Sequence, residues 1–237
     1  MVVKYFSICD RGVGSSMSRS QLDDVATPQK PLLRGVLHQY AFVVSLMAGV
    51  LLVATATGGR AILAAFVFAL SASALLGVSA LYHRRDWSPQ ARMRMRRLDH
   101  SMIFLLIAGT YTPFALLVLT GTLATAVLTV VWAGALIGSM TQLAWAEAPK
   151  WIMAVICIAL GWVAVIALPA IVDGIGPVAT GLLALGGVLY TAGAIVYAMQ
   201  RPNFVPGVFG YHELFHLLVV IAVILQYAVV AFYVLPH

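Results

Sequence analysis

Two histidines one helical turn apart are the clearest chemical signal in the sequence. Residues 212–216 read H-E-L-F-H, and His212 and His216 would share one helix face because positions i and i+4 are neighbours. The string matches the H-E-x-x-H pattern, in which both histidines bind zinc and the glutamate serves as base. The residues that follow offer Gln226 but no obvious third ligand, which disfavours a metalloprotease of this type. The histidine pair by itself is as consistent with a metal site as with histidines that only pack or form hydrogen bonds.

Ser79, His83 and Asp99 are further polar residues in otherwise apolar surroundings. Ser79 and His83 are four positions apart and so share a helix face. Asp99 and Glu213 are the two acidic residues that fall within predicted helices, whereas the others lie in the N-terminal segment or in loops. An ionisable group at membrane depth is costly, so both residues are candidates for a function.

The composition makes lipid the natural solvent of this chain. Of its 237 residues, 62% are hydrophobic and 9% are charged, against about 25% charged in a soluble domain. The apolar runs exceed the roughly 20 residues that cross a bilayer as a helix, and they lack the alternation of a membrane β-strand. The sequence therefore predicts an all-α integral membrane bundle. The net charge of +6 is attributed to membrane topology, so we expect no nucleic-acid partner.

Seven transmembrane helices are expected, separated by short segments that contain Gly, Pro and charged residues. Their approximate ranges are 36–57, 61–82, 98–119, 122–145, 150–171, 176–199 and 210–235. Residues 1–30 are polar and lack the apolar core of a cleavable signal peptide, so we expect a flexible cytoplasmic tail there. Residues 31–237 are the expected seven-helix transmembrane domain. Cys9 and Cys157 are not placed together by this arrangement, and no disulfide is expected.

The basic residues set the expected orientation. With seven spans, all of the 14 Lys and Arg residues except Arg60 fall on the same side as the N-terminus. Cytoplasmic loops carry an excess of Lys and Arg in membrane proteins. We therefore expect the N-terminus in the cytoplasm, the C-terminus outside, and the protein in the cell inner (plasma) membrane.

This topology brings distant polar residues to one membrane leaflet. The Ser-Pro pair at 88–89 predicts the start of the third helix, which places Asp99 about ten residues, or roughly 15 Å, along its axis. The second span ends and the seventh begins at the same face, so His83, His212 and His216 share that depth. Three neutral imidazoles and a water form a common catalytic zinc shell. The sequence therefore predicts a zinc site.

Asp99 and Ser79 are the candidate catalytic residues beside that site. Asp99 could accept a proton from water, and Ser79 could donate a hydrogen bond to a developing oxyanion. His38 and His100 are interpreted as packing or interface residues, and His100 points about 100° away from Asp99 around its helix. The arginines at 96–97 are interpreted first as topology signals and second as a site for an anionic lipid head group.

Five ordered segments resemble the hemolysin III family, the bacterial branch of the progestin and adipoQ receptor superfamily. The matching residues are Lys30-Pro31 with Arg34-Gly35, Ser79-Ala80-Leu81-Tyr82-His83, Asp99-His100, Ala108-Gly109-Thr110-Tyr111-Thr112-Pro113 and His212-Glu213-Leu214-Phe215-His216. They fall in the same order, in helices one, two, three and seven. The middle of the chain, roughly 120–205, matches in hydropathy alone.

The resemblance implies a seven-helix protein with a cytoplasmic N-terminus and a zinc ion near the inner face. The matching positions put zinc on His83, His212 and His216, with Asp99 and Ser79 around a metal-bound water. The related alkaline ceramidases hydrolyse a lipid amide, and the adiponectin receptors resemble them in this site. We therefore expect a zinc-dependent hydrolase of a membrane lipid amide or ester, which makes membrane lipid its partner.

Two other functions fit the same residues. The zinc could be structural, joining helices in a receptor or a regulator of membrane homeostasis. The protein could instead form a pore, since the family is named for haemolysis. Spans four to six, however, offer few polar side chains to line one: Ser139, Thr141, Gln142 and Tyr190. The sequence does not indicate an oligomeric state.

Overall fold

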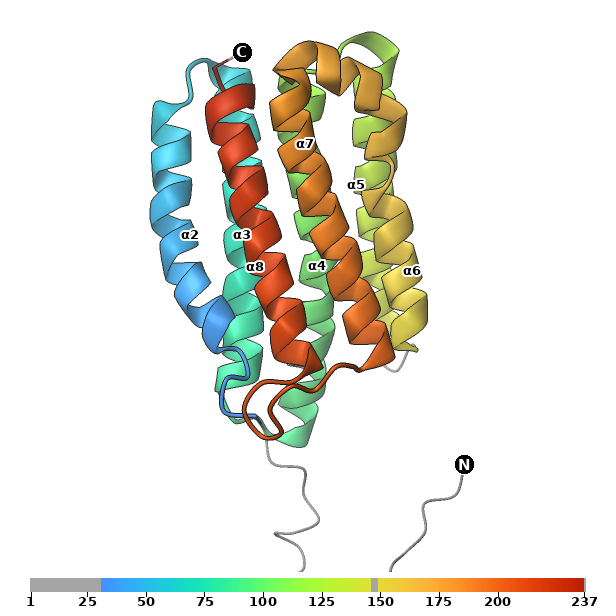
Figure 1. Cartoon of the computed structure of the whole chain (residues 1–237). Coiled ribbons are helices and arrows are strands. Elements are labelled where there is room, and N and C mark those ends of the chain that lie inside the picture. The colour runs from blue at the N-terminus through green and yellow to red at the C-terminus, as the bar shows by residue number, and fades with distance from the viewer. Residues whose placement is uncertain (1–30, 146–148, 237) are drawn as a thin grey trace, which may run out of the picture. The chain divides into compact units, whose positions relative to one another are not determined.

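The computed structural model describes residues 31–145 and 149–236, and its regular elements there are helices and one isolated β-bridge. The helices are α2 (Val36–Thr55), α3 (Gly59–Arg84), α4 (Pro89–Leu117), α5 (Gly121–Ala144), α6 (Lys150–Gly161), α7 (Ala164–Met199), α8 (Tyr211–Val229) and a terminal π-helical turn, η1 (Val230–Val234) (Figure 1). The predicted all-α class is confirmed. The expected tail, 1–30, lies outside the described residues and stays a prediction.

Six helical segments among the described residues are long and apolar enough to cross a membrane. Five of them are α2, α3, α4, α5 and α8 with η1, close to the expected spans. The sixth, Lys150–Met199, has 50 residues. At about 1.5 Å per residue it would measure roughly 75 Å, more than twice the hydrocarbon core of about 30 Å. This segment contains the expected spans 150–171 and 176–199, and it is not one straight helix.

Two interruptions divide this long segment. The expected span 150–171 is not continuous, because α6 ends at Gly161 and α7 begins at Ala164. Gly176 breaks α7 again, with φ 79° and ψ 167°. Glycine tolerates a positive φ, and Pro177 after it has no backbone N–H to donate, so the helical ladder cannot run through this point. The first break was not predicted because the residues around it are apolar.

The side chain of Tyr111 forms hydrogen bonds with backbone groups on both sides of the break between α6 and α7. Backbone groups at membrane depth need partners inside the protein, and a helix break leaves some of them free. The Tyr111 hydroxyl donates a hydrogen bond to the carbonyl of Gly161 and accepts one from the N–H of Ala164 at 2.8 Å. The indole of Trp162 donates to Thr191 Oγ1 at 3.1 Å, which ties the turn to the later part of α7.

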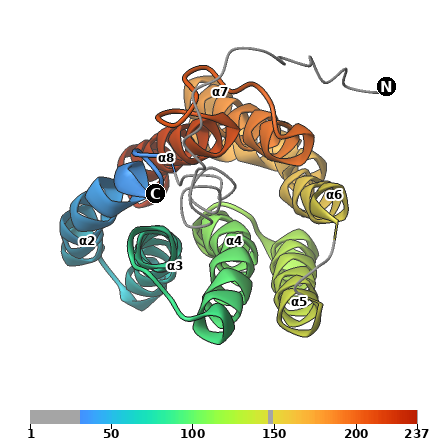
Figure 2. The ribbon, with the colours of Figure 1, turned by 90° about the horizontal axis from the view of Figure 1, so that it is seen from below.

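The start of α4 and its packing follow from small residues. Ser88 Oγ accepts the N–H of Ala91 at 3.4 Å with proline at the first helical position, so the predicted start is confirmed. Gly109 lets α4 approach α3, because a Cβ there would lie only 2.0 Å from Ser71 Oγ. In the view from below, α4 lies between α3 and α5 (Figure 2).

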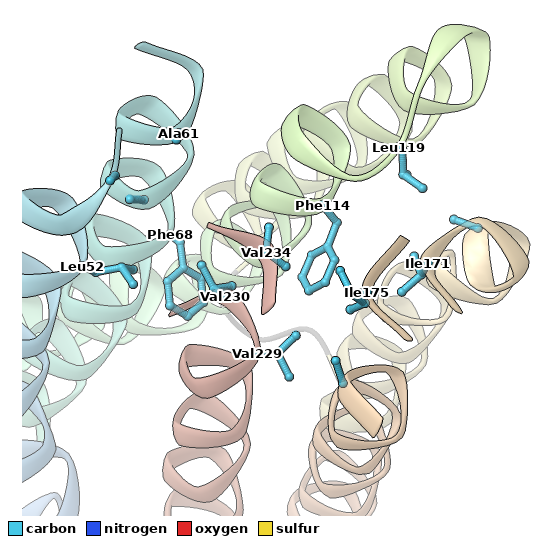
Figure 3. Close-up of a cluster of buried hydrophobic side chains, with 14 of the residues drawn as sticks. Leu52, Ala61, Phe68, Phe114, Leu119, Ile171, Ile175, Val229, Val230 and Val234 are labelled. Carbon is cyan, nitrogen blue, oxygen red and sulfur yellow. The ribbon is translucent and has the colours of Figure 1, made fainter. Parts of the chain in front are cut away.

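An apolar cluster joins the helices at the end away from His83. Phe68 of α3, Phe114 of α4, Ile171 of α7 and Val229 and Val230 of the last helix meet there (Figure 3). The opposite end is basic: apart from Arg60, every described Lys and Arg lies in the loops and helix ends around His83. They are Arg34, Arg84, Arg85, Arg92, Arg94, Arg96, Arg97, Lys150 and Arg201. The two ends of the helices therefore differ in charge.

The role of Tyr111 can be tested by removing its hydroxyl. Tyr111→Phe leaves the Gly161 carbonyl and the Ala164 N–H without their partner, which should lower the free energy of unfolding by about 1–3 kcal/mol. Denaturant titration of the purified protein in detergent measures this change. Tyr40→Phe is the matched control because Tyr40 is 70% exposed. Equal stability of the two variants would contradict the proposed role of the Tyr111 hydroxyl.

Candidate metal centre

His83, His212 and His216 form a compact buried cluster. His83 lies in the last turn of α3, and the other two lie in the first turns of α8. One imidazole nitrogen of each lies within 4.8 Å of the others, and the Nε2 atoms of His83 and His212 are 3.1 Å apart. None of the three residues is more than 8% exposed. The structure thus brings together the three histidines that the sequence placed at one leaflet.

The spacing of the cluster fits a metal ion. A tetrahedral zinc with Zn–N bonds of about 2.0–2.1 Å separates its ligand nitrogens by about 3.3 Å. The 3.1 Å between His83 and His212 is close to that value. Neutral imidazoles are common ligands of zinc, copper, iron and nickel, whereas Mg²⁺ and Ca²⁺ prefer oxygen. The three histidines could therefore hold a transition-metal ion.

Gly35 allows the chain to pass directly over His83. Its φ is 78°, and a Cβ at this position would lie 2.6 Å from the Cβ of His83. A side chain here would both clash with the histidine and strain the backbone. This close approach explains why a glycine precedes α2, and it fixes the last turn of α3 against the segment that begins α2.

Glu213 is used for structure at the start of α8. It is 1% exposed, and its Oε1 pairs with Arg34 Nε. Its Oε2 accepts the backbone N–H of Gly210 at 2.8 Å, which caps the helix. Both carboxylate oxygens are therefore engaged. The glutamate of the H-E-L-F-H string secures α8 to the segment before α2. It is therefore not free to serve as the base that a metalloprotease of this type requires.

Asp99 of α4 lies beside the cluster. Its Oδ2 is 3.8 Å from His83 Nε2 and 3.6 Å from His100 Nδ1. The Ser79 hydroxyl, one turn before His83 on α3, interacts with the same carboxylate. The gap of 3.8 Å exceeds a direct hydrogen bond. Asp99 is thus close enough to act on a small molecule held at the histidines without being bonded to them.

Two histidines interpreted as packing residues belong to the surroundings of the site. His100 Nε2 lies 2.9 Å from the hydroxyl of Tyr197, which links α4 to α7. His38 of α2 is 2% exposed and stacks on His216, with ring centroids 3.8 Å apart and planes 7° from parallel. The sequence held a signal for His38, because it lies near the start of the first span, at the same end of the helices as His83 at the end of the second span.

The polar cluster borders a largely apolar cavity of about 300 Å³. The polar part of the wall includes His38, Ser79, Asp99, His212 and His216. The rest comes mainly from α4, α6, α7 and α8 and includes Phe104, Phe114, Ile171 and Val219. Arg96 and Arg97, considered above for a lipid head group, do not line this cavity. Polar side chains and a space that could hold a hydrocarbon chain therefore lie next to each other between the helices.

A protein-family model described as "Haemolysin-III related" matches residues 26–227. The chain belongs to the hemolysin III family. Hemolysin-3 of Bacillus cereus is 30% identical over 213 residues, which is 88% of this chain and 93% of its own length. The hemolysin-3 homolog of Bacillus subtilis (strain 168) is 34% identical over 119 residues, 50% of this chain and 53% of its own length. This hemolysin III family member, whose described residues include six long apolar helical segments, is a multi-pass membrane protein.

Metal content tests the histidine cluster. The purified protein should carry about one zinc per chain, and the double variant His212→Ala, His216→Ala should carry almost none because two of three ligands are gone. The variant should also melt at a lower temperature, since metal binding is linked to folding. Elemental analysis gives the zinc content, with His237→Ala as the control. Equal zinc in wild type and double variant would rule out this site.

Proposed function

We propose that this protein is a zinc-dependent hydrolase of a membrane-embedded lipid amide or ester, resembling a ceramidase in chemistry. The observation that carries the proposal is the shared wall of the cavity, where His212, His216 and Asp99 meet an apolar space of about 300 Å³. A lipid substrate has the same two parts, a polar carbonyl group and a hydrocarbon chain. The carbonyl would lie at the histidines and the chain along α4, α6 and α7.

The residues around the cluster have distinct tasks in this reaction. His83, His212 and His216 would hold the zinc, and the chemistry that it would supply is an activated water and a polarised carbonyl. Asp99 accepts the proton of the attacking water and returns it to the leaving group, as its place 3.8 Å from His83 allows. Ser79 donates a hydrogen bond to the developing oxyanion.

The same proposal includes seven membrane crossings, with the N-terminus in the cytoplasm and the C-terminus outside the cell inner membrane. The length of Lys150–Met199 and its break at Gly176 support two crossings by this segment. The basic residues around His83 support a cytoplasmic position for that end, and Arg60 is the one basic residue at the other end among the described residues. The metal centre then lies near the cytoplasmic face.

A structural metal is the alternative function. It is favoured by the place of the ligands, since His83 and the pair on α8 would join two helices while His38 packs on them from a third. Such a site would suit a receptor or a regulator of membrane homeostasis. A pore ranks below both, although two relatives are named hemolysins. The described cavity wall is largely apolar, which opposes the passage of ions.

Release of fatty acid from lipid tests the hydrolase. We expect the purified zinc-loaded protein to release fatty acid from a total lipid extract, and Asp99→Asn to do so at least about 100-fold more slowly, because general-base catalysis is lost. Asp86→Asn is the matched control, an identical change at an exposed loop position. No release above a protein-free blank, with zinc still bound, would favour the structural metal instead.

Labelling of single cysteines tests the orientation. In a background of Cys9→Ser and Cys157→Ser, Gly59→Cys should react with an impermeant maleimide added to intact spheroplasts, and Asp86→Cys should react only after lysis. A Cβ at Gly59 meets no other atom within 4 Å, so the substitution fits without strain. The opposite labelling pattern would invert the topology and move the metal centre to the outer face.

A further inference from the structure

His216 lacks the support that a metal-binding histidine normally has. Such histidines usually donate their second ring N–H to a carboxylate, a carbonyl or a water, which fixes the plane of the ring. The Nδ1 of His216 is fully buried and has no hydrogen-bond partner in the described part of the chain. When Nε2 binds the metal, no hydrogen bond from Nδ1 holds the ring. The orientation of this ring must come from packing.

The packing is provided by His38. The two rings are 3.8 Å apart at their centroids and 7° from parallel, so the His38 ring is stacked on one face of the His216 ring. The helix that carries His38 is itself held along α8. Arg34, just before α2, pairs with Glu213, and the Tyr227 hydroxyl donates to the carbonyl of Ala48 at 3.0 Å. The stack is therefore anchored at both ends of the contact between α2 and α8.

The same geometry keeps His38 away from the metal. A metal lies in the plane of the imidazole that binds it, because the nitrogen lone pair lies in that plane. Two nearly parallel planes do not meet close to the rings, so one metal cannot bind both His38 and His216 while they are stacked. His38 is also absent from the group of nitrogens that lie within 4.8 Å of one another. It can hold the cluster without filling the fourth coordination position.

We infer that His38 is a positioning residue of the metal centre, whose ring fixes the plane of His216 by stacking and stays outside the coordination shell. This inference rests on the metal site of the proposed function. It assigns a task to a residue that touches neither the metal nor the reacting atoms. Its effect should depend on a flat ring at position 38 and not on the ring nitrogens, which have no hydrogen-bond partner among the described residues.

Three variants separate the ring from its nitrogens. His38→Phe keeps a flat ring, and the cavity beside it leaves room for the extra carbon. His38→Gln keeps a polar side chain of similar length without a ring, and His38→Ala keeps neither. In competition with a chromophoric chelator, we expect the Ala and Gln variants to bind Zn²⁺ about 10- to 100-fold more weakly than wild type. The Phe variant should stay within about threefold of wild type.

Cobalt spectra check that His38 is not a ligand. The visible absorption of the Co²⁺-loaded wild type and His38→Phe should have the same shape and intensity, since the ligand set is unchanged. The inference would be overturned if His38→Ala bound Zn²⁺ as tightly as wild type, or if the Co²⁺ spectrum of His38→Phe differed from that of wild type. It would also be overturned if His38→Gln kept the wild-type affinity for Zn²⁺ and His38→Phe lost it. If His38→Ala does not fold, Phe against Gln decides. A wild type that binds no metal would contradict the proposed function and this inference together.

Discussion

Three imidazoles buried within 4.8 Å of one another are the constraint on which the rest of the structure depends. A neutral imidazole has one donor and one acceptor nitrogen, and one cation can be shared by the acceptor lone pairs of three such rings. The contacts around the cluster hold the three rings close together. Gly35 lets the chain pass over His83, and Arg34 fixes Glu213 and the start of α8.

The cavity connects this polar end to the broken helix on the other side of the bundle. Gly161, Trp162 and Ala164 line the cavity, and they are the residues at which α6 gives way to α7. A break in this place would expose backbone polar groups to the apolar space, but Tyr111 binds the groups on both sides of it. The hydroxyl of Tyr111 on α4 thus pairs with the backbone groups at the break, and this part of the cavity wall stays apolar. Asp99, on the same helix, supplies the one described carboxylate within 4 Å of a cluster histidine.

Much of the site could be predicted because hydropathy and charge together fix depth in a membrane. His83, Asp99 and His212 were brought to one end by counting spans and basic residues, and the start of α4 was read from Ser88 and proline. The stack of His38 on His216 could not be predicted. It depends on how α2 is rotated about its axis against α8, and an apolar helix in lipid carries little pattern that sets this angle.

The helix break and the ion pair escaped prediction for different reasons. The residues between α6 and α7 are apolar and look like the middle of a span, since their backbone partner, Tyr111, is supplied from another helix. Arg34 and Glu213 lie 179 positions apart, and neither the topology count nor the family resemblance pairs the arginine with the glutamate. In both cases the decisive contact is long-range, whereas composition and spacing report on depth and helix face.

The most direct test of the metal centre is X-ray absorption spectroscopy at the zinc edge of the purified, zinc-loaded protein. We predict a first shell of nitrogen and oxygen at about 2.0–2.1 Å, with outer-shell scattering from three imidazoles and a fourth ligand that is not histidine. A shell that contains sulfur, or one without the imidazole signals, would contradict the claim that His83, His212 and His216 hold the metal.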